Sequence, residues 1–169
     1  MLAARENRNG KNNVKNAFVM QLTAPAASLH GLRVVNAAGG WPAIVVKGGS
    51  RATLRRLLIE SQDPQGLCGV LVEGGARPII EDTIIRGVAE HGAGVSFRGE
   101  GTGGRLARCI VERPASDGIR VYAQAAPTII QCRVSVGDVF LMRLFRGDSS
   151  KRSHHHTRRR FGLRQQHKQ

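Results

Sequence analysis

The sequence predicts a single all-β domain in which short strands are wound into a coil, and three observations predict this fold class. Short aliphatic runs begin at residues 54, 80, 106 and 129, so their starts differ by 26, 26 and 23 residues. A second series begins at residues 43, 69, 94 and 118 and keeps nearly the same step. The chain also has 21 glycines and only 4% aromatic residues, which favours tight turns and aliphatic packing.

Each repeat unit consists of an aliphatic strand, a polar loop, a second strand that opens with a small residue, and a turn rich in Gly, Ala or Pro. The first series is 54-LRRLLI-59, 80-IEDTII-85, 106-LARCIV-111 and 129-IIQCRV-134. The second series is 43-AIVV-46, 69-GVLV-72, 94-GVSF-97 and 118-GIRV-121. Self-similarity at about 20 to 50 residues is typical of stacked repeats. Because these units are too short for a helix, we expect a coil of strands rather than the alternative, an ordinary β-sandwich.

In such a coil each strand pairs in parallel with its copy one turn away, about 4.8 Å along the axis, and alternate side chains point inward. The residues expected inside are Val70 and Val72, Val95 and Phe97, and Ile119 and Val121. The residues between them, Leu71, Ser96 and Arg120, are expected to face outward.

The net charge of +14 divides the chain into three parts. Residues 1–28 carry a net +3, residues 29–140 a net +3 and residues 141–169 a net +8. We therefore assign 29–140 to the coil, 1–28 to a partial cap or disordered segment, and 141–169 to a basic, disordered tail. Nucleic acid is a partner only through this tail. Its alternatives are a nuclear signal at 151–160 and weak metal binding by the histidines at 154–156.

The cysteines indicate the compartment. Cys68, Cys109 and Cys132 have no CxxC spacing, and no apolar signal-peptide core precedes them, which favours a reducing, intracellular and cytoplasmic setting, with the nucleus as alternative. The apolar run 17–22 is too short to span a bilayer, so no membrane association is expected. Cys109 and Cys132 occupy the same position of the repeat and should stack inward as small hydrophobes, with a regulatory disulfide as the alternative.

Five segments carry a resemblance to a known family: 78-PIIEDTIIRG-87, 94-GVSF-97, 99-GEG-101, 118-GIRV-121 and 126-APTIIQC-132. Over about residues 29–137 the repeat resembles the right-handed parallel β-helix of the pectate-lyase-like superfamily. More narrowly, it is similar to the two-rung repeat in the substrate arm of certain F-box ubiquitin-ligase receptors. The resemblance implies a right-handed β-helix of four to five short rungs.

The chain departs from the family pattern in two places. Asp117 stands where the family usually has Ala, and Cys109 and Cys132 stand where stacked Asn is frequent. Because an F-box needs more residues than 1–28 supply, we do not expect ligase-adapter function to follow from the fold.

Two enzyme-like patterns are better explained by structure. The segment 99-GEGTGG-104 has dinucleotide-site spacing, but a strand rather than a helix follows it, so we interpret its glycines as a turn. Sugar cleavage needs clustered carboxylates, or calcium ligands with a base, whereas Glu81 and Asp82 are the one adjacent acidic pair. We therefore expect no enzyme, no cofactor and no metal. If the chain were an enzyme, it would be a polysaccharide lyase or glycoside hydrolase.

Three sets of residues at the repeat spacing form a candidate partner surface. Leu58, Ile84 and Ile110 each lie between two inward residues and should form an exposed apolar stripe, unless a terminal segment covers it. Arg56, Asp82 and Arg108 should form a ladder of alternating charge. Glu73, Arg98 and Tyr122 should form a second ladder. The expected function is a non-enzymatic protein-binding scaffold, and the alternative is a polysaccharide-binding or polysaccharide-cleaving protein.

Overall fold

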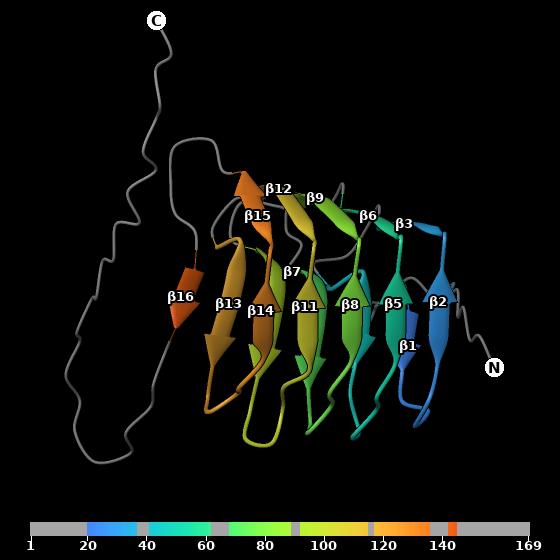
Figure 1. Ribbon diagram of the computed structural model, residues 1–169, viewed down its shortest axis with the longest axis vertical. Coiled ribbons are helices and arrows are strands. Elements are labelled where there is room, and N and C mark those ends of the chain that lie inside the picture. The colour runs from blue at the N-terminus through green and yellow to red at the C-terminus, as the bar shows by residue number, and fades with distance from the viewer. Residues whose placement is uncertain are drawn as a thin grey trace, which may run out of the picture.

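The computed structural model describes residues 20–36, 41–61, 68–88, 92–114, 117–135 and 142–144. These residues form an all-β parallel solenoid, and no helix occurs among them. The chain passes through three sheets in turn and then repeats the circuit, so that strands distant in sequence lie side by side (Figure 1). The predicted coil of parallel strands is confirmed.

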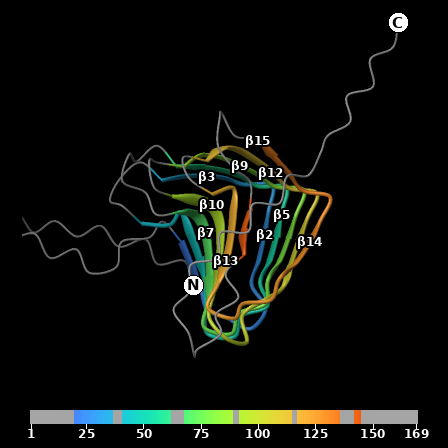
Figure 2. The same ribbon diagram turned by 90° about the vertical axis from the view of Figure 1, so that its left-hand side faces the viewer.

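Three parallel sheets surround the core, as the view along the stack shows (Figure 2). Sheet A contains β1 (Met20–Leu22), β4 (Ile44–Val46), β7 (Cys68–Glu73), β10 (Ala93–Arg98), β13 (Ile119–Tyr122) and β16 (Met142–Leu144). Sheet B contains β2 (Ser28–His30), β5 (Thr53–Arg55), β8 (Ile79–Glu81), β11 (Arg105–Ala107) and β14 (Thr128–Ile130). Sheet C contains β3 (Arg33–Asn36), β6 (Leu58–Ser61), β9 (Ile84–Val88), β12 (Ile110–Pro114) and β15 (Arg133–Ser135).

The predicted interior rows are present. Val95 pairs with Val70 on one side and with Ile119 on the other, and Phe97 pairs in the same way with Val72 and Val121. All six side chains are buried. Equal spacing in the sequence therefore becomes contact between equivalent residues in the core.

Each aliphatic run of the first series contains two strands rather than the single strand that we expected. The break falls at Arg56, Asp82, Arg108 and Gln131, whose φ angles of 52°, 52°, 51° and 53° lie in the left-handed region. Backbone hydrogen bonds between coils hold this corner, since Arg56 N donates to Glu81 O at 3.2 Å and Asp82 N donates to Ala107 O at 3.1 Å. The corner turns the chain from sheet B into sheet C, so each coil has three strands.

Two strands of sheet A have a glycine at or next to their first residue, Gly94 in β10 and Gly118 before β13, because side chains of sheet C occupy the adjacent space. A Cβ added at Gly94 would collide with the Val111 side chain of the same coil, and one added at Gly118 would collide with Val134. The glycines at 99–104 form the turn between β10 and β11, as expected from the sequence. The small residues are thus set by packing.

One outward position differs from the prediction. Leu71 and Arg120 are partly exposed, but Ser96 is buried, with only 4% of its surface exposed. Its short side chain lies between the larger Leu71 and Arg120, which accounts for the burial.

Strand pairing extends beyond the expected 29–140 domain on both sides. Strand β1 lies within the expected N-terminal segment, and β16 lies just after residue 140. The expectations for residues 1–19 and for the basic tail from residue 145, including its histidines, lie outside the described residues. Within the described part of the chain, no helix is long and apolar enough to cross a membrane.

Candidate functional site

The structure places Leu58, Ile84 and Ile110 next to one another on the outer side of sheet C, in β6, β9 and β12. Each of the three is half-buried, whereas the residues immediately before and after it in the sequence are buried in the core. The same row continues to Arg33 beside Leu58 and to Arg133 beside Ile110. This row, which we name the stripe, is therefore an aliphatic strip with an arginine at each end.

An open hollow lies at the N-terminal end of the stripe. It measures about 340 Å³ and is lined by Gly31, Leu32, Arg33, Arg56, Leu57, Leu58, Asp82 and Ile84. Leu32 is 44% exposed at its edge. Gly31 occupies the corner position that Arg56, Asp82 and Arg108 occupy in later coils, and nothing lies within 4 Å of a Cβ built on it. The absence of a side chain there leaves the hollow open.

The corner ladder forms in part as predicted. Arg108 binds Asp82 with two hydrogen bonds, Nε to Oδ1 at 2.7 Å and Nη2 to Oδ2 at 3.0 Å. The hydrogen bonds from Arg108 hold the pKa of Asp82 below its usual value and raise that of the guanidinium. Arg56 makes no ion pair within 4.0 Å with any described residue, but its positive charge contributes to the low pKa of Asp82, and its exposed side chain lines the hollow.

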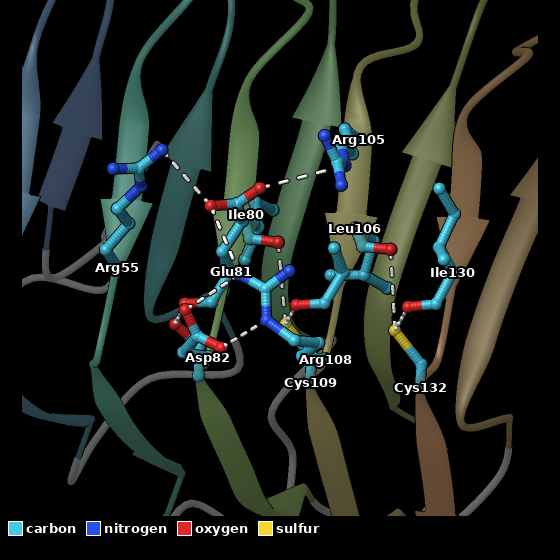
Figure 3. A network of polar contacts seen from close by, with 12 residues as sticks. Arg55, Ile80, Glu81, Asp82, Arg105, Leu106, Arg108, Cys109, Ile130 and Cys132 are labelled. Carbon is cyan, nitrogen blue, oxygen red and sulfur yellow. Dashed lines mark hydrogen bonds and ion pairs between the residues drawn. The ribbon is translucent and has the colours of Figure 1, made fainter.

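Glu81 is the centre of the corner's electrostatics, and we did not assign it a role from the sequence. Its carboxylate lies 3.2 Å from Arg55, 3.7 Å from Arg105 and 3.5 Å from Arg108 (Figure 3). Only 9% of its side chain is exposed. The available signal was the 26-residue step from Arg55 to Glu81, which makes the two residues neighbours in sheet B.

A second charged ladder, also missed, follows the other edge of the stripe. Glu60, Arg86 and Glu112 are register neighbours in sheet C. Arg86 lies 3.9 Å from Glu60 and 3.3 Å from Glu112, and Arg33 Nε lies 2.6 Å from Glu60 Oε2. Ion pairs thus border the stripe on both sides.

The ladder of Glu73, Arg98 and Tyr122 forms in register, but on sheet A. Arg98 Nη1 lies 4.0 Å from Glu73 Oε2. The structure therefore does not bring these three residues together with the stripe, and the predicted partner surface divides into two separate faces.

The cysteines at the corner continue a ladder that begins with Thr83. Thr83 Oγ1 donates to Glu81 O at 2.9 Å and accepts from Leu57 N at 3.4 Å. Cys109 and Cys132 take the same position one and two coils later, and all three cysteines are free thiols. Cys109 is fully buried and Cys132 is partly exposed.

The thiols differ in acidity. The hydrogen bond between Cys109 and Cys132 raises the pKa of Cys109 and lowers that of Cys132. Burial raises the pKa of Cys68, in sheet A, to about 12. Among the residues that the structure describes, no group of three or more His, Cys, Asp or Glu side chains is placed to hold a metal ion.

Stacked coils of three parallel strands define a parallel β-helix, a class of repeat protein. The family model described as "Right handed beta helix region" matches residues 21–154, and the chain belongs to this family. The predicted right-handed β-helix is thus confirmed. Comparison with curated proteins and with solved structures found no match.

Proposed function

We propose that this β-helix is a non-enzymatic scaffold that binds a protein partner through the stripe and its hollow. The observation that carries the proposal is the open hollow beside Leu32, Leu58 and Ile84, which continues into the aliphatic strip on sheet C. Contiguous exposed apolar surface with a polar border is typical of a docking site. The resemblance of the repeat to the substrate arm of F-box receptors also supports a protein partner.

The charge around the hollow indicates the chemistry of the partner. The Arg33 side chain is 62% exposed, and Arg56 is exposed and makes no ion pair within 4.0 Å with a described carboxylate, although its charge acts on the nearby Asp82. Residues 51–56, 77–82 and 103–108, on and beside sheet B, contain six exposed arginines and two carboxylates. Because this surface is net positive, the partner segment that fits it is acidic and carries aliphatic side chains for the hollow. An intracellular, cytoplasmic location is part of the proposal, and the cysteine spacing supports it.

Selection of peptides displayed on phage against the intact chain tests this proposal. The enriched sequences should combine Asp or Glu with Leu, Ile or Val. Their affinity, measured by fluorescence anisotropy, should fall at least about tenfold, or about 1.4 kcal/mol, when Leu58, Ile84 and Ile110 are all changed to Ser.

A matched control separates the stripe from general loss of apolar surface. Ile79 and Ile130 on sheet B are 37% and 39% exposed. Changing both to Ser should leave binding unchanged. Equal affinity of the stripe variant, or enrichment of basic peptides, would contradict the proposal.

The arginine-rich surface of sheet B favours one second candidate, an acidic polysaccharide ligand. Arg55 and Arg105 are each about half exposed, although both also approach Glu81. Retardation of the chain in gels that contain polygalacturonate, lost when Arg55 and Arg105 are changed to Gln but kept in the stripe variant, would select this alternative. Release of unsaturated sugar products would further indicate cleavage.

A further inference from the structure

Cys109 and Cys132 are stacked directly on one another across adjacent coils. Each residue immediately precedes a strand of sheet C, and those strands, β12 and β15, pair Ile110 with Arg133. Arg133 N donates a hydrogen bond to Cys109 O at 2.9 Å. The usual separation of paired strands is about 4.8 Å, within the range of about 4.4 to 6.8 Å found between the Cα atoms of a disulfide.

The two side chains also point in the same direction. Cys109 Sγ lies 3.3 Å from Ala107 O in its own coil and 3.5 Å from Ile80 O in the preceding coil. Cys132 Sγ repeats this arrangement, at 3.4 Å from Ile130 O and 3.5 Å from Leu106 O (Figure 3). The Cys132 side chain is therefore directed toward the coil of Cys109, where its sulfur atom contacts a backbone carbonyl.

Solvent reaches the two sulfur atoms unequally. Among the described residues, β14 and β15 are the last strands of sheets B and C, so the coil that contains Cys132 forms the edge of both sheets there. Cys109 lies one coil further in and is fully buried, whereas Cys132 is partly exposed. The acidity has the same asymmetry, because the hydrogen bond from Cys109 lowers the pKa of Cys132. A thiolate that is both more acidic and more accessible reacts first.

We propose that Cys109 and Cys132 form an oxidisable dithiol site, in which Cys132 reacts with a hydroperoxide and Cys109 then closes a disulfide between the two coils. The Cys132 thiolate attacks the peroxide O–O bond; a sulfur–oxygen bond forms, and hydroxide or alkoxide leaves and takes up a proton. Cys109 loses its thiol proton and attacks the Cys132 sulfur, so the S–S bond forms as the S–O bond breaks and water leaves. With hydrogen peroxide, two thiols lose two electrons in total and two water molecules are produced.

The disulfide joins neighbours that the fold already holds in register. The disulfide would link the starts of β12 and β15, two strands of sheet C that are already paired. The oxidised form therefore ties the coil of Cys132, whose strands are the last described ones in sheets B and C, to the preceding coil. Fraying of this edge should decrease on oxidation.

Peptide mapping of the full chain tests the proposal. After treatment with hydrogen peroxide and alkylation of the remaining thiols, trypsin should release residues 109–120 joined to residues 121–133, with Cys68 alkylated. Dithiothreitol should separate the joined peptides. The oxidised chain should also unfold at a higher temperature than the reduced chain.

Three variants assign the roles. Cys109→Ser should give a sulfenic acid on Cys132 that dimedone labels, with no disulfide within the chain. Cys132→Ser should leave Cys109 reduced, and Cys68→Ser should behave as the wild type. A disulfide that contains Cys68, a disulfide between two copies of the chain, or sulfinic acid on Cys132 while Cys109 stays a thiol would overturn the proposal.

Discussion

Arg108 and Asp82 meet across adjacent coils through two nearly equal hydrogen bonds, 2.7 Å and 3.0 Å long, at corner positions where both residues have positive φ. The ion pair therefore ties two turns of the chain at the point where each changes sheet. Neither residue is a glycine, so the corner carries a charged side chain in both coils.

Changing Asp82 to Asn should lower the thermal midpoint at neutral pH. Asn tolerates the same backbone conformation, so the loss reports the ion pair rather than backbone strain. The pKa of Asp82 is lowered by Arg108, so the pair stabilises the fold above the unfolded-state pKa of about 3.9 and loses this effect as the pH falls through the folded-state pKa. Melting curves of wild type and variant should therefore converge in acid.

Glu100→Gln is the control for that measurement. Glu100 is exposed and forms no ion pair with the described residues, so removal of its charge should leave the pH profile of the melting temperature unchanged. A constant difference between Asp82→Asn and wild type down to strongly acidic pH would contradict the assignment.

Changing Glu81 to Gln should destabilise the fold by about 1–2 kcal/mol, because its largely buried carboxylate lies within ion-pair distance of three arginines. Chemical denaturation gives this free energy of unfolding. Glu112→Gln, which removes one contact of 3.3 Å from a more exposed side chain, should cost less. The reverse order would show that Glu81 is not the centre of the network.

Changing Gly118 to Ala should destabilise the fold by about 1–3 kcal/mol, because the added methyl group would overlap the Val134 side chain. The double variant with Val134→Ala removes that overlap. Its loss of stability, measured by denaturation, should be smaller than the sum of the two single losses. Simple additivity would mean that Val134 is not what requires a small residue there.

Changing Gly31 to Asn should fill the hollow and weaken binding of selected acidic peptides about tenfold, or about 1.4 kcal/mol. Asn accepts the φ of 66° at this position, and the space around it is open. Gly48→Asn makes the same change at φ 68°, also in open space but in the turn after β4. Anisotropy titrations in which both variants bind alike would show that the hollow is not used.

The repeat spacing predicted most of the fold, because parallel in-register stacking converts a constant step in sequence into contact. Val70, Val95 and Ile119 form one interior row for this reason, and the same step brings Asp82 to Arg108. The third strand of each coil was missed, because in every coil after that of Gly31 the corner residue is Arg, Asp or Gln rather than the glycine that is usual at positive φ.

The candidate site was predicted less completely. The repeat spacing identified its residues, but it did not show which of the three sheets each residue lies on. Treating the first run as one continuous strand hid the corner, and with it the three arginines around Glu81. The hollow depends on a missing side chain at Gly31 and on the exposure of Leu32, which a repeat pattern does not reveal. Spacing identifies neighbours along the stack, but the turn between sheets decides which way they point.

Every sheet in this molecule stacks its strands along one axis, with β1 at one end and β16 at the other (Figure 1). The inter-strand hydrogen bonds therefore lie nearly parallel to that axis, and a pulling force applied between the ends is borne by one interface between turns after another. We expect the coils to detach one after another under force, so that the chain extends in optical tweezers in a succession of small steps rather than in one abrupt rupture.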